Sequence, residues 1–126
     1  MEKQLLSKKT WAVVGANRNS EKYGNMIYKK LKEQGYKVFA VNPMYESIEG
    51  DTCYKDLSSL PKKPDVINMV VSPTRALPIL EEAAALGIKY VWFQPGTHDE
   101  STQDKIAELE LEAIYACILV VLKLYK

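Results

Sequence analysis

The chain reads Thr10-Trp11-Ala12-Val13-Val14-Gly15 near its beginning, and this stretch decides the fold. Apolar side chains at successive positions are typical of a strand that is buried on both faces of a parallel sheet. After a polar loop, the segment 23–34 carries apolar residues at helical spacing, and Gly35 follows where a helix C-cap is expected. This order predicts the first half of a β-α-β unit, in which the two strands are parallel.

The same alternation continues along the chain. We expect strands over residues 37–41, 65–71, 89–93 and 113–116, and helices over residues 73–86 and 102–111. The segment 45–54 is irregular, with a short strand expected near Ile48, and residues 57–60 form at most one helical turn. Crossover connections of helical length join parallel strands and are right-handed. The sequence therefore predicts one α/β domain over residues 1–126, a three-layer fold with helices on both faces of a doubly wound parallel sheet.

Composition limits the class of protein. The 126 residues are 47% apolar and 26% charged, with a net charge of +1. The overall charge of the protein therefore does not favour binding to nucleic acid or to an anionic membrane. The apolar stretch 116–122 is too short to span a bilayer, and residues 1–9 lack the apolar run of a signal peptide. Cys53 and Cys117 show neither metal-ligand spacing nor the density of a disulfide scaffold. We therefore expect a cytoplasmic protein with two free thiols, no metal, no membrane contact and no nucleic-acid partner.

Clusters of small, polar or turn-forming residues follow four of the predicted strands. They are Gly15-Ala16-Asn17-Arg18, Asn42-Pro43, Ser72-Pro73 and Gln94-Pro95-Gly96. The carboxyl ends of parallel strands meet at one edge of the sheet, and ligands bind there where the strand order reverses. Each cluster alone is equally well explained as an ordinary turn, but four on one edge favour a ligand site.

The loop after the first strand is the most informative of these clusters. Gly24 is expected to let the start of the helix lie close to a ligand or to the sheet, where free N–H groups favour a pyrophosphate. Arg18 and Lys22 can add charge-assisted contacts to phosphate oxygens, or they are solvated loop charges. The loop lacks the G-x-G-x-x-G fingerprint, and Asn42 stands where NAD sites usually carry an acidic residue. No G-x-x-x-x-G-K-[ST] occurs, which excludes a P-loop.

Longer motifs surround these clusters. They are Val13-Val14-Gly15-Ala16, Arg18-Asn19, Glu21-Lys22-Tyr23-Gly24, Val41-Asn42-Pro43, Ile48-Glu49-Gly50, Pro64-Asp65-Val66, Val71-Ser72-Pro73, Val91-Trp92-Phe93-Gln94-Pro95-Gly96 and Cys117-Ile118-Leu119-Val120. Together they resemble the small CoA-binding-domain proteins, stand-alone relatives of the CoA-binding domain in the alpha subunit of succinyl-CoA synthetase. The resemblance covers nearly the whole chain. It implies a Rossmann-like fold, CoA binding and no established catalytic activity for the isolated domain.

The resemblance also implies which residues border the cofactor. By position, Gly15, Ala16, Arg18, Lys22 and Tyr23 resemble the phosphate loop, Asn42 and Pro43 the wall beside the pyrophosphate, Val71, Ser72 and Pro73 the adenosine side, and Gln94, Pro95 and Gly96 the border of the cleft near the pantetheine arm. Asn17 and Gly24 join the predicted site because they lie in the same loop. Residues 97–101 depart from the family pattern, and the tail after Cys117 is more apolar than is usual in the family.

Several conspicuous side chains are explained more simply by structure than by catalysis. His98 is the one histidine, and we expect it in a loop beside a helix start, where Asp99 and Glu100 are favourable charges. Cys117 either faces the thiol end of a bound CoA or is a buried, inert thiol. Trp92 is expected in the core. The apolar tail either extends the last strand at the sheet edge or forms a contact between two copies, and we favour a homodimer.

These observations predict a module that binds coenzyme A or an acyl-CoA at the carboxyl edge of the sheet, without catalytic residues. The alternative is a sensor of NAD(H) or of an adenine nucleotide that acts through a partner protein, and Asn42 argues against NAD. A third possibility is a fragment of an acyl-CoA transferase, but no convergent acid, base and nucleophile support it.

Overall fold

The computed structural model describes residues 1–125 and contains, within them, one sheet of seven strands in the order β3-β4-β2-β1-β5-β6-β7. The strands are β1 (Thr10–Val14), β2 (Lys37–Val41), β3 (Ser47–Ile48), β4 (Asp51–Tyr54), β5 (Val66–Met69), β6 (Tyr90–Phe93) and β7 (Glu112–Tyr115). The helices are α1 (Glu2–Leu6), α2 (Tyr23–Glu33), the 3₁₀ helix η1 (Leu57–Ser59), α3 (Pro73–Ala85), α4 (Glu100–Glu108) and α5 (Ile118–Tyr125). Neighbouring strands are parallel except for β3 and β4. The predicted doubly wound α/β fold is confirmed.

Strand β1 lies at the centre of the sheet, and all of its residues are buried. It pairs with β2 on one side and with β5 on the other, which sets Ala12 beside Phe39 and Ile67. The chain runs outward from β1 to β2 and β4, and then returns to β5 on the opposite side of β1. The strand order therefore reverses between β1 and β5, and a ligand crevice is expected outside the carboxyl ends of these strands.

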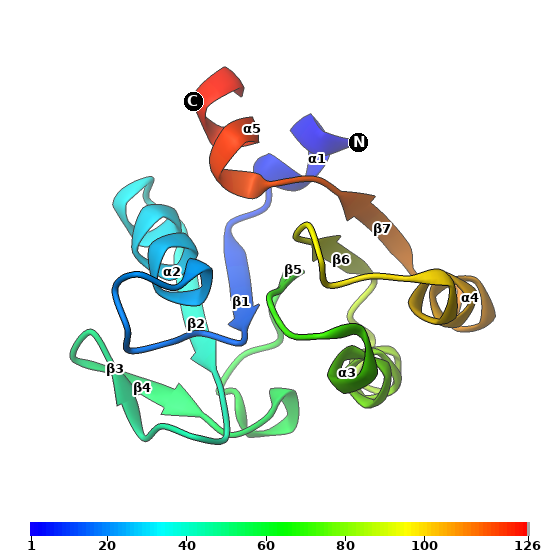
Figure 1. Ribbon diagram of the computed structural model, residues 1–126, viewed down its shortest axis with the longest axis horizontal. Coiled ribbons are helices and arrows are strands. Elements are labelled where there is room, and N and C mark those ends of the chain that lie inside the picture. The colour runs from blue at the N-terminus through cyan, green and yellow to red at the C-terminus, as the bar shows by residue number, and fades with distance from the viewer. Residues whose placement is uncertain (126) are drawn as a thin grey trace.

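Helices cover both faces of the sheet. Figure 1 shows α1, α2 and α5 on one face and α3 and α4 on the other. Trp11 and Val13 pack into the core beneath α2 and α5, whereas Ala12 and Val14 pack into the core beneath α3 and α4. Trp92 is fully buried in the first of these cores, as expected. Because both faces are covered, β1 is apolar throughout instead of alternating.

The apolar tail is a helix and does not extend the last strand, which corrects one of the two interpretations of this segment. Ile118, Val121 and Leu122 are the buried residues of α5, and their spacing of three and four is that of one helix face. Val120 and Leu124 lie elsewhere on the helix and are exposed. Because exposed positions are apolar too, the sequence shows a continuous apolar run, which cannot distinguish a strand from a helix. Among residues 1–125, no helix combines the length and apolar character needed to cross a bilayer.

Three further segments differ from the elements that the sequence predicts. Residues 2–6 form α1, which supplies Leu5 and Leu6 to the core and was not expected from the sequence. The irregular segment contains the β3–β4 hairpin, and β4 extends the parallel sheet beside β2. Helix α4 spans 100–108 instead of 102–111, because the Asp99 side chain accepts a hydrogen bond from the Thr102 N–H and begins the helix earlier. Hydrogen bonds from Ser101 and Thr102 lower the pKa of the Asp99 carboxyl.

Candidate functional site

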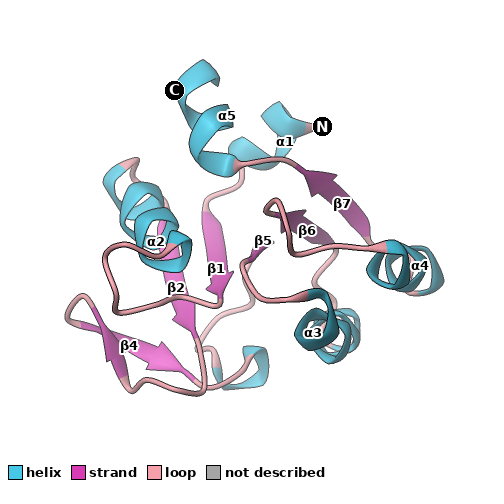
Figure 2. Cartoon of the chain, in the orientation of Figure 1, coloured by secondary structure: helices cyan, strands magenta, loops and turns pink. Residues whose placement is uncertain are grey.

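The loop between β1 and α2 is folded tightly onto the end of β1, and Figure 2 shows its long course before the helix begins. Gly15 has a φ of 99°, a conformation that residues with a side chain rarely adopt. A Cβ atom on Gly15 would lie 2.7 Å from the carbonyl oxygen of Val70, and one on Gly24 would lie 2.1 Å from the carbonyl oxygen of Gly15. The two glycines therefore allow the first turn of α2 to lie against the carboxyl end of β1.

Asn42 holds the beginning of this loop in place. Its side-chain amide donates a hydrogen bond to the carbonyl oxygen of Ala16 at 2.8 Å, and its side-chain oxygen accepts one from the Met44 N–H at 2.9 Å. Asn42 is buried, so these contacts are shielded from water. A carboxylate in this position could not donate to Ala16. The requirement for a donor explains why an amide occupies the position where NAD sites usually carry an acid.

The middle of the loop is held by other asparagines. The buried Asn25 amide donates to the carbonyl oxygen of Asn17 at 2.9 Å and to the Glu49 carboxylate at 3.1 Å. The side-chain oxygen of Asn17 accepts a hydrogen bond from the Asn19 N–H at 2.8 Å. The loop's own hydrogen bonds therefore hold its shape, and such preorganisation lowers the entropic cost of binding a ligand.

Two cationic side chains of the loop are exposed. Arg18 lies over the ring of Tyr45, with 6.0 Å between the guanidinium carbon and the ring centroid. Lys22 is the N-cap residue of α2, and its side chain does not cap the helix. Within residues 1–125, neither side chain forms an ion pair. Both charges are therefore available to an anion at the start of α2.

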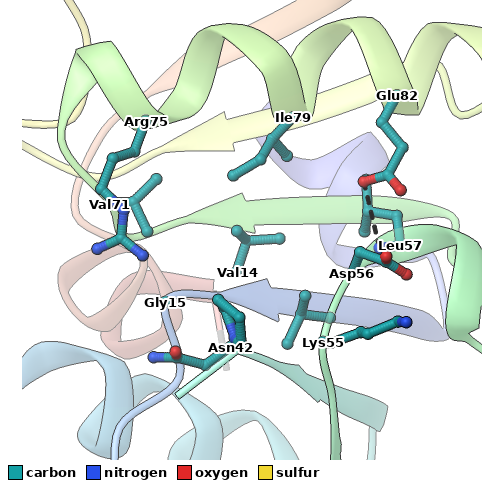
Figure 3. Close-up of a pocket in the computed structure, with 12 residues that line it drawn as sticks. Val14, Gly15, Asn42, Lys55, Asp56, Leu57, Val71, Arg75, Ile79 and Glu82 are labelled. Atoms are coloured by element: carbon teal, nitrogen blue, oxygen red, sulfur yellow. Dashed lines mark hydrogen bonds between the residues drawn. The ribbon is translucent and has the colours of Figure 1, made fainter.

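A pocket of about 150 Å³ opens beside the loop, and Figure 3 shows its lining. Six lining residues are apolar (Val14, Val41, Pro43, Leu57, Val71 and Ile79), and the others are Gly15, Asn42, Lys55, Asp56, Arg75 and Glu82. Whole-ligand pockets usually enclose roughly 300–1,000 Å³, so this one has room for one part of a larger ligand. It lies on the α3 side of the sheet, where the ends of β1 and β2 and the segment after β5 come together.

The charged residues of the pocket fall into two groups. The Glu82 carboxylate accepts hydrogen bonds from the two backbone N–H groups at the start of η1, at 3.2 and 3.3 Å, and Asp56 caps the same 3₁₀ helix. These carboxylates therefore stabilise the wall of the pocket. Lys55 and Arg75 are exposed, and in the described chain neither takes part in an ion pair. The free charge at the rim of the pocket is thus positive.

Of the predicted site residues, Gly15, Asn42, Pro43 and Val71 line the pocket. Ala16, Asn17, Arg18, Lys22, Tyr23 and Gly24 belong to the adjoining loop and the first turn of α2, and Ser72 and Pro73 begin α3. The predicted site residues at the carboxyl end of β6 are arranged differently. Gln94 is buried, and its side-chain oxygen accepts a hydrogen bond from the Ile118 N–H at 3.0 Å, while Pro95 and Gly96 are exposed. The Gln94 side chain thus faces the start of α5.

The pocket residues of the β4–η1 segment and of α3 were not predicted from the sequence. Lys55, Asp56 and Leu57 follow β4, a strand that lies in the segment expected to be irregular. Arg75, Ile79 and Glu82 come from α3 and are spaced by four and three residues, which places them on one helix face. This spacing could have identified the three residues as site candidates only if that face of α3 were known to point toward the end of β1. Val14 and Val41 were assigned to strands and not to the site.

A separate charged cluster lies where α2 meets β4. The Tyr28 hydroxyl donates to the Asp51 carboxylate at 2.7 Å, and Lys32 makes a second contact with the same oxygen. The hydrogen bonds from Lys32 and Tyr28 lower the pKa of Asp51, while burial and the neighbouring carboxylate raise the pKa of Tyr28. None of these three residues lines the pocket.

The remaining reactive side chains also lie outside the pocket. The His98 ring packs edge-on against Tyr115, with the centroids 4.7 Å apart, just before the Asp99 cap of α4. Cys117 is half-buried immediately before α5, and burial raises the pKa of the Cys53 thiol. Over residues 1–125, no group of three or more His, Cys, Asp and Glu side chains is arranged to hold a metal ion.

The family model described as a CoA binding domain matches residues 9–123. The chain belongs to the CoA-binding domain family. This CoA-binding domain is 33% identical over 105 residues to the alpha subunit of an ADP-forming acetate–CoA ligase II from Pyrococcus furiosus, a match that covers 82% of this chain and 23% of the subunit. It is 33% identical over 81 residues to an ADP-forming acetate–CoA ligase from Methanocaldococcus jannaschii, covering 64% of this chain and 12% of the ligase. The domain thus spans less than a quarter of the length of these ligases.

Solved structures include proteins of the same size as this domain. A conserved hypothetical protein from Pyrococcus furiosus is 42% identical, with a TM-score of 0.85 over 89% of this chain and 97% of that chain. A protein from Thermus thermophilus is 26% identical, with a TM-score of 0.88 over 97% of this chain and 93% of that chain. The fold therefore occurs both as part of large ligases and as small stand-alone proteins.

Proposed function

We propose that this domain binds coenzyme A or an acyl-CoA at the carboxyl ends of β1 and β2 and performs no catalysis of its own. One observation carries the proposal: Gly15, which begins the ordered loop, and Asn42, which holds that loop in place, both line the adjoining apolar pocket. A ligand with a flat apolar end and a chain of phosphates matches this combination. The proposal rests on that geometry and on membership of the family.

The pocket fits the adenosine end of the ligand. Its apolar lining and its volume of about 150 Å³ suit one ring system, so the rest of the ligand extends out of the pocket. Figure 3 shows the Arg75 side chain reaching from α3 toward the Gly15 side of the pocket. Lys55 adds a second cation to the lining. These two side chains are suited to the phosphate on the ribose of CoA, a group that NAD lacks.

The loop fits the pyrophosphate. The first turn of α2 lies against the end of β1 because of Gly24, and unpaired N–H groups at a helix start attract an anion. Arg18 and Lys22 lie in the same loop and are free of ion pairs in the described chain. The pantetheine arm then runs along the sheet edge toward the exposed Pro95 and Gly96.

The alternative ligand, NAD(H), is disfavoured by Asn42. Its amide is committed to the Ala16 carbonyl, so the position offers no carboxylate to the hydroxyls of a ribose. A catalytic role is disfavoured because Glu82 and Asp56, the carboxylates in the pocket, are hydrogen-bonded to η1. We therefore favour a carrier or sensor of CoA, and its two free thiols suit a reducing compartment such as the cytoplasm.

The ligand is tested by isothermal titration calorimetry with CoA, dephospho-CoA, NAD and ATP. We expect CoA to bind most tightly, to lose affinity when the ribose phosphate is removed, and to bind more weakly as salt is raised. Equal or tighter binding of NAD would overturn the assignment to CoA. Turnover of acetyl-CoA by the lone chain would overturn the non-catalytic part of the proposal.

The phosphate contacts are tested with Arg18→Ala and Lys22→Ala. Each substitution is expected to weaken CoA binding roughly tenfold, about 1.4 kcal/mol for one charge-assisted contact. Lys62→Ala is the matched control, since Lys62 is exposed and lies outside the loop and the pocket. Unchanged affinity in both loop variants would remove the phosphates from this loop.

A further inference from the structure

The two edges of the sheet are built differently. The edge strand β3 has two residues and is flanked by the exposed Glu46 and Glu49. The opposite edge, β7, has four residues, Glu112–Tyr115, and contains neither lysine nor proline. Short strands, charges and prolines are the devices that keep edge strands from pairing with other chains. The β7 edge lacks most of them.

The backbone groups that β7 leaves free follow from its pairing with β6. The N–H groups of Glu112 and Ala116 donate to the carbonyl oxygens of Lys89 and Phe93, at 2.9 and 3.1 Å. Alternate residues of a strand direct their backbone groups to opposite sides. The N–H and C=O groups of Ala113 and Tyr115 therefore point away from β6, outward from the sheet.

Exposed apolar and charged side chains border this edge. A groove of about 540 Å³ is lined by residues 113–115 of β7 together with Met1, Glu2, Lys3 and Tyr125. Met1, Tyr115 and Tyr125 are exposed despite their size. Figure 1 shows β7 as the outermost strand, with α1 and α5 to one side of it. An unpaired edge bordered by exposed apolar groups is typical of an interface.

We propose that a second copy of this chain pairs antiparallel with β7 about a twofold axis at Ile114, joining two sheets into one. In this register Ala113 lies opposite the partner's Tyr115, and Tyr115 lies opposite the partner's Ala113. These are the residues whose backbone groups point outward, so each pair exchanges two hydrogen bonds. Shifting the register by two residues would pair only one of them with an outward-pointing strand residue. The strand is thus complementary to itself, as a twofold interface requires.

The charges are compatible with this arrangement. Glu112 lies opposite the partner's Ala116 and is already paired with Lys89 at 3.1 Å, so no like charges face each other along the strand. Glu2 and Lys3, which line the groove, have opposite signs and can pair reciprocally across a twofold axis. The carboxyl end of β1 lies three strands away, so the dimer leaves the proposed CoA site open.

The first test compares the sedimentation velocity of the wild type with that of Ala113→Pro and Leu124→Ser. Proline at position 113 removes an outward N–H without touching the pairing with β6, so we expect a folded monomer that still binds whatever nucleotide the wild type binds. Leu124→Ser alters the exposed face of α5 and is expected to remain dimeric. A wild type that stays monomeric up to about 100 µM, where micromolar interfaces are populated, would overturn the proposal.

The second test fixes the register and does not require a proline variant to fold. Ile114 and the partner's Ile114 form a pair without direct hydrogen bonds, with Cα atoms about 4.5 Å apart, close enough for a disulfide. Ile114→Cys in a Cys117→Ser background should give a covalent dimer under mild oxidation. Val120→Cys in the same background is the control, since Val120 is exposed on α5. A dimer that cross-links at 120 but not at 114 would show that another face is the interface.

Discussion

Asn42 and Gln94 lie on opposite sides of β1, at the corners formed by the carboxyl ends of β2 and β6. Each is a buried amide that follows a parallel strand and precedes a proline. Asn42 donates to Ala16 in a loop beside an open pocket, whereas Gln94 accepts a hydrogen bond from the N–H of Ile118 at the start of α5. The same local chemistry therefore borders an open pocket in one corner and supports the docking of a helix in the other.

The difference shows what a polar turn at the end of a buried strand indicates. The turn marks the edge of the sheet where a ligand can bind, but elements from distant parts of the chain decide whether the corner stays open. At Asn42 the neighbours are η1 and α3, which leave a pocket between them. At Gln94 the neighbour is α5, which uses the amide as the acceptor for its first N–H.

The largest effect is expected for Gly24→Ala, which disturbs the loop beside the pocket at the Asn42 corner. The new methyl group would lie 2.1 Å from the carbonyl oxygen of Gly15, so α2 or the loop must move. We expect the free energy of unfolding to fall by about 3 kcal/mol, the upper end for overpacking, and CoA binding to be lost. Urea denaturation and calorimetry measure the two effects.

Gly35→Ala is the matched control for this change. Gly35, unlike Gly24, has a positive φ, but a Cβ atom there would meet nothing within 4 Å. The left-handed backbone is expected to cost alanine about 1 kcal/mol, with CoA binding retained. If Gly24→Ala behaved like Gly35→Ala, the close contact with Gly15 would not be what shapes the loop.

The second prediction tests the comparison of Asn42 with Gln94 by substituting each of the two amides in turn. Asn42→Asp removes the donor to Ala16 and adds a negative charge beside the proposed phosphate site, so we expect CoA affinity to fall at least tenfold, about 1.4 kcal/mol. Gln94→Met keeps the size but leaves the buried Ile118 N–H without an acceptor. We expect this variant to lose about 2 kcal/mol of stability and to keep its CoA affinity within about threefold.

Calorimetry and denaturation of both variants separate the two roles. A large loss of affinity in Gln94→Met with unchanged stability would make Gln94 a ligand contact. Affinity unchanged in Asn42→Asp would remove Asn42 from the site.

The smallest effect is expected at Asp51, which belongs to neither corner. Its pKa is lowered because Lys32 and Tyr28 donate to it, so its contribution to stability is present above the unfolded pKa of about 3.9 and is lost as pH falls through the lowered folded value. Asp51 is partly exposed, which limits the contribution to less than about 1 kcal/mol at pH 7. Asp51→Asn should therefore be slightly less stable than the wild type at pH 7, and the difference should shrink as pH falls below about 3.9, with CoA affinity unchanged.

Denaturant unfolding across this pH range checks the result. A difference that grew as pH fell would contradict the direction of the Asp51 shift.

Much of the fold could be predicted from the sequence because buried parallel strands have a local signature. The run 10–15 and its counterparts predicted the strands, and the turn residues after them indicated the edge where we propose the ligand site. The tail was harder, since α5 has apolar residues on its exposed positions as well as on its buried face, which removes the helical period. Strand β4 was missed because its four residues do not form an apolar run.

Local pattern alone thus determined the parallel sheet, the glycine-bounded loop and the amide–proline corners, because burial and backbone turns leave their mark on neighbouring residues. Three-dimensional packing decided which corner is open, brought Lys55 and Arg75 to the rim of the pocket, and closed the Gln94 corner with α5. Those outcomes depend on distances between segments that are far apart in the sequence. Such distances are set when the helices pack against the two faces of the sheet, and no short stretch of sequence encodes them.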